Sequence, residues 1–544
     1  MATVREVLFG MMRDLKLTRI FGNIGSTEEK MFADFPSDFE YVLALHESVA
    51  IAMADAYSQM SGKPVHVNLH TAASGNGVGA VTTAWHNRTP MVITAGQQTR
   101  EMLLMEPYLT NKNPYLEFAP WVKWSYEPAR PEDVPGAFLR AYAMAIQSPP
   151  GPVYLSLPMD DMDKECPRIP ARRLVHPRIS AGPDLLAPIA EAISLAQNPA
   201  LIVGGSVDQL GGWDDVVRLA EKARCKVFGA PMEGRPGFPE DHSQYQGLAA
   251  ASAEPLREQL EGVDLVVVIG APVFRFYPYT GGSPVPEGAR LIHLTDSTEE
   301  AARAPIGESY LVDPARACAT LADLVVPSQR PLPPLREKLS APEPVGGMIT
   351  ADLLYATIAK LRPADSILVE EEPSTQSRLR DWLPTGKPRS FFSMFSGVLG
   401  YGLPAACGVS LAERDAGGSR RVISLQGDGS TQYTVQAFWN AAHLKLPILF
   451  IIFCNHKYAV LESYANFFGL KEVPGLEIPG IDTVALAKGY GCEGGYARNP
   501  DELESALQRG LAHNDGPYVL QVEILGDAPP LLGDSGPKIQ AGTV

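Results

Sequence analysis

The chain has 544 residues, of which 45% are hydrophobic and 20% charged. This length suffices for three or four globular domains, and the composition excludes an intrinsically disordered or collagen-like chain. The 46 basic and 62 acidic side chains give a formal net charge of −16 at pH 7. Because such a field repels phosphate backbones, we expect no nucleic-acid partner.

Residues 1–20 predict an amphipathic helix rather than a signal peptide, because Arg5, Glu6 and Arg13 interrupt their apolar positions. The most apolar stretches, 265–269 and 448–453, are too short to span a bilayer. Six scattered cysteines form no CxxC pair and suit a reducing compartment. We therefore expect a cytoplasmic protein without a membrane partner.

Two proline-rich stretches, at about 158–183 and 327–347, predict extended connectors, because proline fixes φ and removes a backbone donor. They divide the chain into three segments of similar size. We predict domains at 1–165, 182–328 and 345–526, followed by a tail at 527–544.

Each segment alternates short apolar runs with stretches that have helical periodicity. Such alternation predicts parallel sheets covered by helices on both faces. The expected fold class is therefore α/β, with three doubly wound parallel-sheet domains. The predicted strands are 64–69, 90–95, 152–157, 201–203, 226–228, 265–269, 291–294, 366–369, 421–425, 447–453 and 518–522.

The strongest local motif is Gly427-Asp428-Gly429-Ser430, which follows a predicted strand and precedes a helix expected from about residue 431. Asn455 follows the next strand, so parallel pairing would bring both carboxyl ends to one ligand-binding edge. The glycines and the helix N-terminus suit an anion, and the two oxygen-bearing side chains suit Mg²⁺. GDGS alone is equally typical of a plain turn. Asn455 favours a metal–diphosphate site.

Glu47 is the one carboxylate in an otherwise apolar, alanine-rich stretch at 43–52 that predicts a buried helix. One interpretation is a helix-initiating residue that interacts with the N-terminal dipole. The other is a desolvated carboxyl that exchanges a proton with a bound heterocycle.

His70 ends a predicted strand and precedes a loop of small residues at 71–79. This position favours catalysis about as much as a structural role. Ser26 occupies a similar position after 21–25, and its alternative role is a helix N-cap.

Together these residues resemble the thiamine diphosphate-dependent 2-oxo acid decarboxylase family, and within it the benzoylformate decarboxylases. The resemblance covers the whole chain, which is identified as a member of the family on stretches in all three segments. They are FGNIGS (21–26), NLHTAA (68–73), TAGQQTR (94–100), GPVYLSLP (151–158), IGAPVFR (269–275), GLPAACGVSLAE (402–413) and VPGLEIPGID (473–482).

The resemblance implies pyrimidine, middle and diphosphate domains of similar topology, with thiamine diphosphate and Mg²⁺ as cofactors. Asp428, Asn455 and the backbone carbonyl of Lys457 would hold Mg²⁺. The residues that would line the diphosphate are Ser374, Gly429, Ser430 and Tyr458.

The resemblance also implies roles around the reacting end of the cofactor. Glu47 would bond the pyrimidine N1′ and promote deprotonation of the thiazolium C2. Gly397 would accept from the 4′-amino group, and Leu399 would force the bent cofactor conformation. Ser26 and His70 would bind the substrate carboxylate and move protons.

Three positions depart from the resemblance. Tyr277 stands where a second active-site histidine is expected, and a phenol is a weaker acid than an imidazolium near neutral pH. The resemblance implies that Tyr464 and Leu461 line the substrate pocket; Tyr464 stands where a phenylalanine is expected and would make the pocket more polar. Cys454 stands where an asparagine is expected, and this replacement by another small side chain should not affect function.

Gly204-Gly205-Ser206 in the middle segment follows a predicted strand, as in dinucleotide-binding folds. It lacks the GxGxxG pattern and an acidic residue placed for a ribose, so a purely structural middle domain is expected.

The resemblance implies decarboxylation of an aromatic 2-oxo acid to an aldehyde, with some carboligation. Two other functions remain as alternatives to this decarboxylase. The chain could be a lyase or ligase of 2-hydroxy ketones or 2-hydroxyacyl compounds, or a subunit that binds the cofactor but is catalytically silent. The active unit would be at least a homodimer, and a homotetramer is usual.

Overall fold

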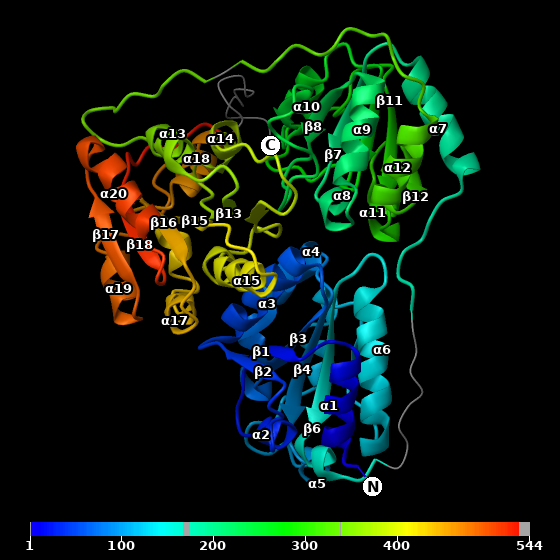
Figure 1. Cartoon of the computed structure of the whole chain (residues 1–544), viewed down its shortest axis with the longest axis vertical. Coiled ribbons are helices and arrows are strands. Elements are labelled where there is room, and N and C mark those ends of the chain that lie inside the picture. Colours follow the sequence, from blue (N-terminus) through cyan, green and yellow to red (C-terminus); the bar gives the residue numbers. More distant parts are fainter. Residues whose placement is uncertain (1, 167–174, 338, 532–544) are drawn as a thin grey trace.

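The computed structural model describes residues 2–166, 175–337 and 339–531, which fold into three α/β domains (Figure 1). In this view the first domain lies at the bottom, the middle domain at the upper right and the third at the upper left. Each domain contains one six-stranded sheet, and the strand pairs within the sheets are parallel.

The first domain has the strand order β2-β1-β3-β4-β6-β5. Its elements are α1 (Val4–Asp14), β1 (Arg19–Asn23), α2 (Glu29–Phe32), β2 (Glu40–Leu43), α3 (Glu47–Ser61), β3 (Val65–Leu69), the 3-10 helix η1 (Thr71–Gly77), α4 (Val78–His86), β4 (Met91–Gln97), α5 (Arg100–Leu103), η2 (Pro114–Leu116), η3 (Ala119–Trp121), β5 (Ser125–Tyr126), η4 (Pro131–Asp133), α6 (Val134–Ile146), β6 (Pro152–Pro158) and η5 (Met159–Asp163).

The middle domain has the order β12-β11-β10-β7-β8-β9. Its elements are α7 (Pro183–Leu195), β7 (Pro199–Val203), α8 (Ser206–Gln209), α9 (Trp213–Ala223), β8 (Lys226–Gly229), β9 (Tyr245–Leu248), α10 (Ala253–Gln259), β10 (Leu265–Ile269), β11 (Arg290–Thr295), α11 (Thr298–Arg303), β12 (Glu308–Leu311) and α12 (Pro314–Leu324).

The third domain has the order β14-β13-β15-β16-β18-β17. Its elements are α13 (Ala351–Leu361), β13 (Ile367–Glu371), α14 (Gln376–Trp382), β14 (Phe391–Ser393), α15 (Gly402–Asp415), β15 (Val422–Gly427), α16 (Asp428–Thr431), α17 (Ala437–His443), β16 (Ile448–Cys454), α18 (Ala459–Phe467), α19 (Thr483–Gly489), β17 (Glu493–Ala497), α20 (Pro500–Ala512) and β18 (Tyr518–Glu523).

The central strands are buried on both faces, as their continuous apolar runs predict. In β10, Leu265, Val267 and Ile269 pack into one hydrophobic cluster, whereas Val266 and Val268 pack into a second cluster on the opposite face. Successive side chains of a strand point to opposite sides of the sheet, so both faces carry a core. The predicted fold class is therefore confirmed.

The expectation of one shared topology holds for two of the three domains. Numbered within its own domain, the third sheet repeats the first sheet's order 2-1-3-4-6-5 strand for strand, but the middle sheet has the order 6-5-4-1-2-3. In the first and third domains the order reverses between the first and third strands. Ligands of open α/β sheets bind at such a reversal. The reversal therefore marks one expected ligand-binding position in each of these two domains.

Helices α3 and α15 occupy equivalent places in the first and third domains and pack against each other (Figure 1). Ala50 and Met53 of α3 share one hydrophobic cluster with Ala405 and Val409 of α15. Gly408 is the point of closest approach, because a Cβ there would overlap the carbonyl oxygen of Met53. The two domains are therefore joined by a common core.

This close approach predicts that Gly408→Ala destabilises the protein. The backbones must separate to admit the methyl group, and such overpacking costs about 1–3 kcal/mol. Gly10→Ala is the control, because Gly10 is an exposed residue within α1 with no atom within 4 Å of its added Cβ. Thermal unfolding should show a lower midpoint for Gly408→Ala and an unchanged or higher one for Gly10→Ala. Equal midpoints would contradict the packing.

Two local predictions were wrong at their boundaries. The N-terminal helix starts at a Thr3–Glu6 capping box but ends at Asp14 rather than near residue 20, because the chain turns through a positive φ at Lys16 and enters β1. The helix expected from residue 431 is one turn, α16, followed by a separate helix, α17.

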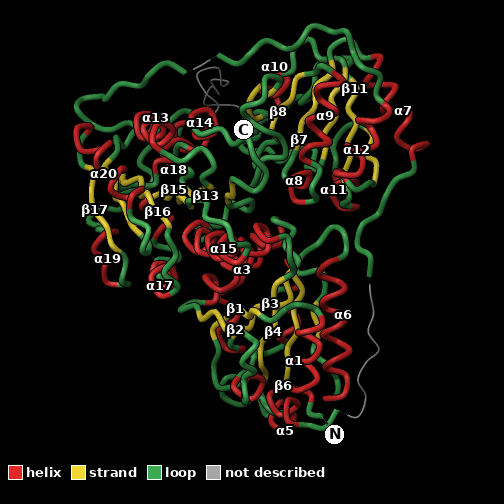
Figure 2. Tube along the Cα trace, viewed as in Figure 1, coloured by secondary structure: helices red, strands yellow, loops and turns green. Residues whose placement is uncertain are grey.

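The connectors run over the surface (Figure 2). Residues 175–182 form no helix or strand, and neither do 327–337 and 339–344. The first predicted connector was wrong at its start, because 158–166 contain the end of β6, the 3-10 helix η5 and a bridge from Glu165 to Thr3. Residues 167–174 of that connector lie outside the described residues. Within the described ranges, no helix combines the length and apolar character that a membrane crossing requires.

Candidate functional site

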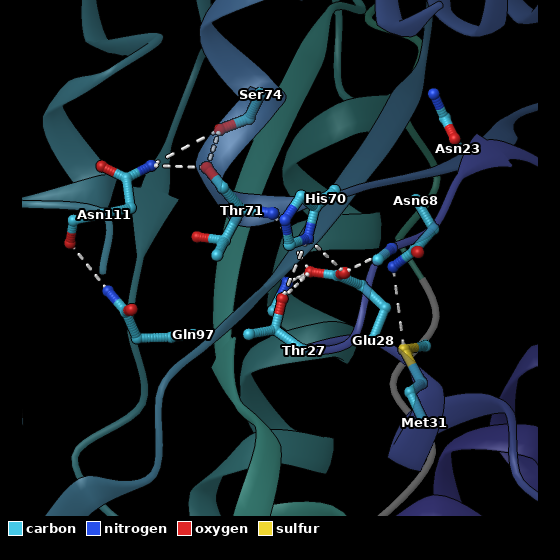
Figure 3. A network of polar contacts seen from close by, with 12 residues as sticks. Asn23, Thr27, Glu28, Met31, Asn68, His70, Thr71, Ser74, Gln97 and Asn111 are labelled. Carbon is cyan, nitrogen blue, oxygen red and sulfur yellow. Dashed lines mark hydrogen bonds and ion pairs between the residues drawn. The ribbon is translucent and has the colours of Figure 1, made fainter. Parts of the chain in front are cut away.

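The strand reversal of the first domain lies between β1 and β3, and polar residues follow both strands. Ser26 lies in the turn after β1, and His70 directly follows β3. Figure 3 shows His70 at the centre of a polar network with Thr27 and Glu28. The small-residue loop predicted after His70 is instead the 3-10 helix η1.

Glu47 is the first residue of α3, where His46 caps the helix by accepting from the Ser48 N–H. Its side chain is buried, with 4% of the residue exposed. One carboxylate oxygen accepts from Asn76 Nδ2 at 3.1 Å, and the other lies 3.5 Å from Asn23 Nδ2. Glu47 is thus both the helix-initiating residue and the buried carboxylate that the two interpretations described.

His70 is held by Glu28, a buried carboxylate that the sequence did not single out. The Nδ1 atom of His70 lies 2.9 Å from Glu28 Oε2 and 3.2 Å from Thr27 Oγ1. Ser26 itself is exposed, and within the described ranges no side-chain hydrogen bond is recorded for it, so it is not an N-cap. It lies between Gly25, which donates its N–H to Glu28, and Thr27.

Asp428 lies at the strand reversal of the third domain, at the end of β15. One carboxylate oxygen accepts the Gly429 N–H at 2.8 Å, and the other accepts the N–H groups of Asn455 and His456 at 3.1 and 2.7 Å. Burial raises the pKa of this carboxyl. Asp428 therefore ties the GDGS turn to the end of β16, as the spacing predicted.

The donor set at this edge suits a hard cation. Asp428 supplies carboxylate oxygens, and Asn455 Oδ1, which accepts the Lys457 N–H at 3.1 Å, supplies an amide oxygen. The thiol of Cys454 and the imidazole of His456 also lie within 4.8 Å of an Asp428 oxygen and of each other. Such softer ligands favour transition metals, so the oxygen atoms and not these two groups fit Mg²⁺.

The turn beside Asp428 brings a glycine against an aromatic ring. A Cβ at Gly429 would lie 2.5 Å from the ring of Tyr458, so only glycine fits against this aromatic face. Ser430 Oγ donates to the carbonyl oxygens of Glu371 and Gly427, and Ser374 lies half-buried in the turn after β13. Ser430 therefore links α16 to the end of β13.

The loop before α15 carries Gly397 and Leu399. Gly397 is exposed with φ +79°, a backbone conformation that favours glycine, and Leu399 is half-buried. A second unpredicted residue, Glu371, anchors the end of this loop by accepting the N–H groups of Gly400, Tyr401 and Gly402. Burial raises the pKa of the Glu371 carboxyl to about 8.

Tyr277 and Tyr464 meet across the boundary between the middle and third domains. Their ring centroids lie 4.9 Å apart at an interplanar angle of 43°. Tyr464 and Leu461 are three residues apart on α18, which begins next to Tyr458, and Leu461 is exposed. The predicted pocket residues therefore lie along a helix that starts at the GDGS edge.

The predicted site residues form two separate groups. Ser26, Glu47 and His70 belong to the first domain, and the remainder belong to the middle and third domains. Throughout the described parts of the chain, no hydrogen bond, ion pair or ring contact joins these three residues to the other predicted site residues. Within this chain the first-domain group is therefore separate from the group in the middle and third domains.

The glycine turn of the middle domain is closed by its own side chains. Gly205 donates its N–H to Glu233 at 2.8 Å, and Arg235 pairs with Asp208 at 2.8 Å. The cavity lined by Gly205, Glu233, Arg235 and Arg88 holds about 30 Å³. Ligand pockets measure about 300 Å³ or more, so this turn has no room for a nucleotide.

Family models match all three domains. The N-terminal thiamine pyrophosphate (TPP) binding domain of thiamine pyrophosphate enzymes matches residues 2–112, the central domain 186–324 and the C-terminal TPP binding domain 375–522. The chain belongs to the thiamine pyrophosphate enzyme family. Thiamine pyrophosphate is the same cofactor as thiamine diphosphate.

The relatives narrow this class. Benzoylformate decarboxylase from Pseudomonas aeruginosa is 40% identical over 527 residues, covering 96% of this chain and 99% of the relative. The crystal structure of benzoylformate decarboxylase from Polynucleobacter necessarius is 41% identical and covers 97% of this chain and 100% of its own, with a TM-score of 0.95. The 4-hydroxybenzoylformate decarboxylase of Rhodococcus jostii RHA1 gives 41% identity, the same coverage and a TM-score of 0.93. The chain is a thiamine diphosphate-dependent carboxy-lyase similar to these enzymes.

Proposed function

We propose that the chain catalyses Mg²⁺-dependent, non-oxidative decarboxylation of an aromatic, benzoylformate-like 2-oxo acid to an aldehyde and carbon dioxide. The observation that carries the proposal is the pair of half-sites, a buried Glu47 in one and the Asp428–Asn455 edge in the other, in a chain 40% identical to a benzoylformate decarboxylase. When bound, thiamine diphosphate supplies an electron-accepting thiazolium for the charge left by carbon dioxide.

The chain's own residues divide the work of binding and proton transfer. Asp428, Asn455 and the Lys457 carbonyl would hold Mg²⁺, and the residues around α16 would hold the diphosphate. Glu47 would exchange a proton with the aminopyrimidine, and Gly397 and Leu399 would orient it. The substrate carboxylate would be bound by Ser26 and His70.

The two half-sites support a homodimer as the minimum active unit. Each site would combine the first-domain group of one subunit with the third-domain group of the other. Exposed apolar side chains in the segment after β4, including Leu104 at 96% and Tyr108 at 89% exposure, are suited to such a contact. We propose a homotetramer of two such dimers, located in the cytoplasm, where its six buried cysteines would stay reduced.

The domain limits form part of the same proposal. The pyrimidine domain would comprise 1–165, the middle domain 182–328 and the diphosphate domain 345–526, with a tail at 527–544. Each proposed domain encloses one of the three sheets.

Carbon dioxide release from a panel of 2-oxo acids tests the proposal. The purified protein with Mg²⁺ and thiamine diphosphate should turn over benzoylformate and ring-substituted analogues in preference to pyruvate. The same panel with an added acceptor aldehyde measures carboligation. Preference for pyruvate would contradict the aromatic substrate class, and no release from any acid would favour the silent-subunit alternative.

Tyr277 is the observation that favours the ligase alternative. The carbon that loses carbon dioxide must gain a proton before the aldehyde can leave, and a phenol is a weaker acid for this step than an imidazolium. Slow protonation gives an acceptor aldehyde more time to react. The enzyme would then release more 2-hydroxy ketone and less free aldehyde.

Tyr277→His should therefore raise the ratio of free aldehyde to 2-hydroxy ketone formed from benzoylformate with excess acetaldehyde. Tyr279→His is the matched control, because Tyr279 lies on the same loop, is 84% exposed and makes no recorded ring contact with Tyr464. Its ratio should equal that of the wild type. An unchanged ratio for Tyr277→His would exclude Tyr277 from the protonation step.

A further inference from the structure

Glu28 is a buried carboxylate whose two oxygens accept from five donors on three segments of the first domain. Oε1 accepts from Thr27 Oγ1 at 2.7 Å and from the N–H groups of Thr71 and Gly96 at 3.1 and 2.7 Å. Oε2 accepts from the Gly25 N–H at 2.9 Å and lies 2.9 Å from His70 Nδ1. Only 1% of Glu28 is exposed.

Two glycines leave the space that the Glu28 and His70 side chains occupy. A Cβ at Gly25 would overlap the His70 ring, and one at Gly96 would lie 2.5 Å from Glu28 Oε1 and 2.6 Å from the Thr27 carbonyl oxygen. Both glycines also donate their N–H groups to the same carboxylate. The loop after β1 and the end of β4 are thus shaped around the Glu28–His70 contact, which Figure 3 shows.

The contact determines which nitrogen of His70 can exchange a proton. An ionised carboxylate only accepts hydrogen bonds, so the ring nitrogen facing Glu28 must carry hydrogen. With hydrogen fixed on Nδ1, Nε2 is the nitrogen left to accept or donate a proton. A carboxylate that fixes a histidine tautomer in this way orients the ring as well.

We propose that Glu28 is a positioning residue that holds His70 in the Nδ1–H tautomer and so reserves Nε2 for the substrate. Glu28 does not itself reach the reacting atoms; it acts through His70. The part of the inference that concerns turnover rests on the proposed decarboxylase function. The tautomer itself does not depend on any substrate.

Glu28→Gln inverts the expected tautomer without changing the size of the side chain. Three donors surround Oε1, so the amide oxygen takes that position and the NH₂ group faces His70 Nδ1. The ring must then accept at Nδ1 and carry its hydrogen on Nε2. The Gly25 N–H loses its partner in the same variant.

Solid-state ¹⁵N NMR of histidine-labelled protein reads the tautomer directly, and His70→Asn identifies the His70 signals by their loss. In the neutral ring, the wild type should show a protonated Nδ1 and a bare Nε2, and Glu28→Gln should show the reverse. Glu117→Gln is the matched control, because Glu117 binds Ser74 and Asn111 in the same region and not His70. It should keep the wild-type tautomer.

A kinetic cycle tests whether Glu28 acts through His70. Glu28→Gln should lower kcat by about tenfold or more with a smaller change in KM, because loss of an orienting partner typically costs 10- to 100-fold. In a His70→Ala background, the same substitution should change kcat by less than about twofold, because residues that act as a unit are not additive. Glu117→Gln should leave kcat unchanged.

Each outcome bears on one claim. An Nε2–H tautomer in the wild type would overturn the proposal even if Glu28→Gln failed to fold. Additive losses of kcat would overturn the claim that Glu28 acts through His70. Absence of decarboxylation by the wild type would contradict the proposed function and leave the tautomer measurement standing.

Discussion

Glu47→Gln should abolish most turnover while the protein keeps its fold and its cofactor. The amide preserves the size of a side chain that is buried at the start of α3 and still offers an oxygen to Asn76 or Asn23. It cannot exchange a proton with the aminopyrimidine. Loss of an essential proton-transfer partner costs about 10²-fold or more in kcat.

The measurement is kcat with saturating thiamine diphosphate, together with the cofactor dissociation constant and the thermal unfolding midpoint. Glu29→Gln provides the control, because Glu29 is an exposed carboxylate in the first turn of another helix, α2. Its turnover should match the wild type. Turnover near the wild-type value in a folded Glu47→Gln protein would remove Glu47 from the mechanism.

Removal of divalent cations should release the cofactor. The Asp428 carboxylate and the diphosphate are both anionic, and the Asn455 oxygen adds no positive charge. Only a cation between them turns repulsion into binding. After prolonged chelation, calorimetry should therefore show little thiamine diphosphate binding until Mg²⁺ is restored.

The variant Asp428→Asn tests the requirement for a divalent cation at a single residue. The variant should need a Mg²⁺ concentration at least about tenfold higher to bind the cofactor, because it loses one ligand charge. Asp501→Asn, at an exposed position in the first turn of α20, should behave as the wild type. Equally tight cofactor binding without any divalent ion would contradict the metal site.

The central strands other than β1 could be predicted from sequence because burial on both faces leaves an unbroken apolar run. The seven residues of β16, for example, are all buried. The edge strands could not, because half-exposed backbone carries mixed side chains. In β12 and β17 most residues are partly or fully exposed, so neither strand has an apolar run.

The site residues likewise fall into those that the sequence could locate and those that it could not. Asp428, Asn455 and His70 follow strands directly, so the position of each strand end locates them. Glu371 was missed because its partners are backbone N–H groups, which every residue type carries, and three of the five partners of Glu28 are also backbone N–H groups. In addition, the donor of Gly96 lies 68 residues from Glu28 along the chain, and only the folded sheet brings the two together.

The identical strand order of the first and third domains, with α3 and α15 in equivalent places, is the pattern that duplication of one ancestral unit would leave. Each copy retains the same strand reversal, but one now presents Ser26 and His70 there and the other presents Asp428. A cofactor with two chemically different ends can therefore be bound by two versions of one architecture. If Tyr277 and Tyr464 line the substrate pocket as proposed, substitutions where they meet would change substrate preference without altering the strand reversal of either copy.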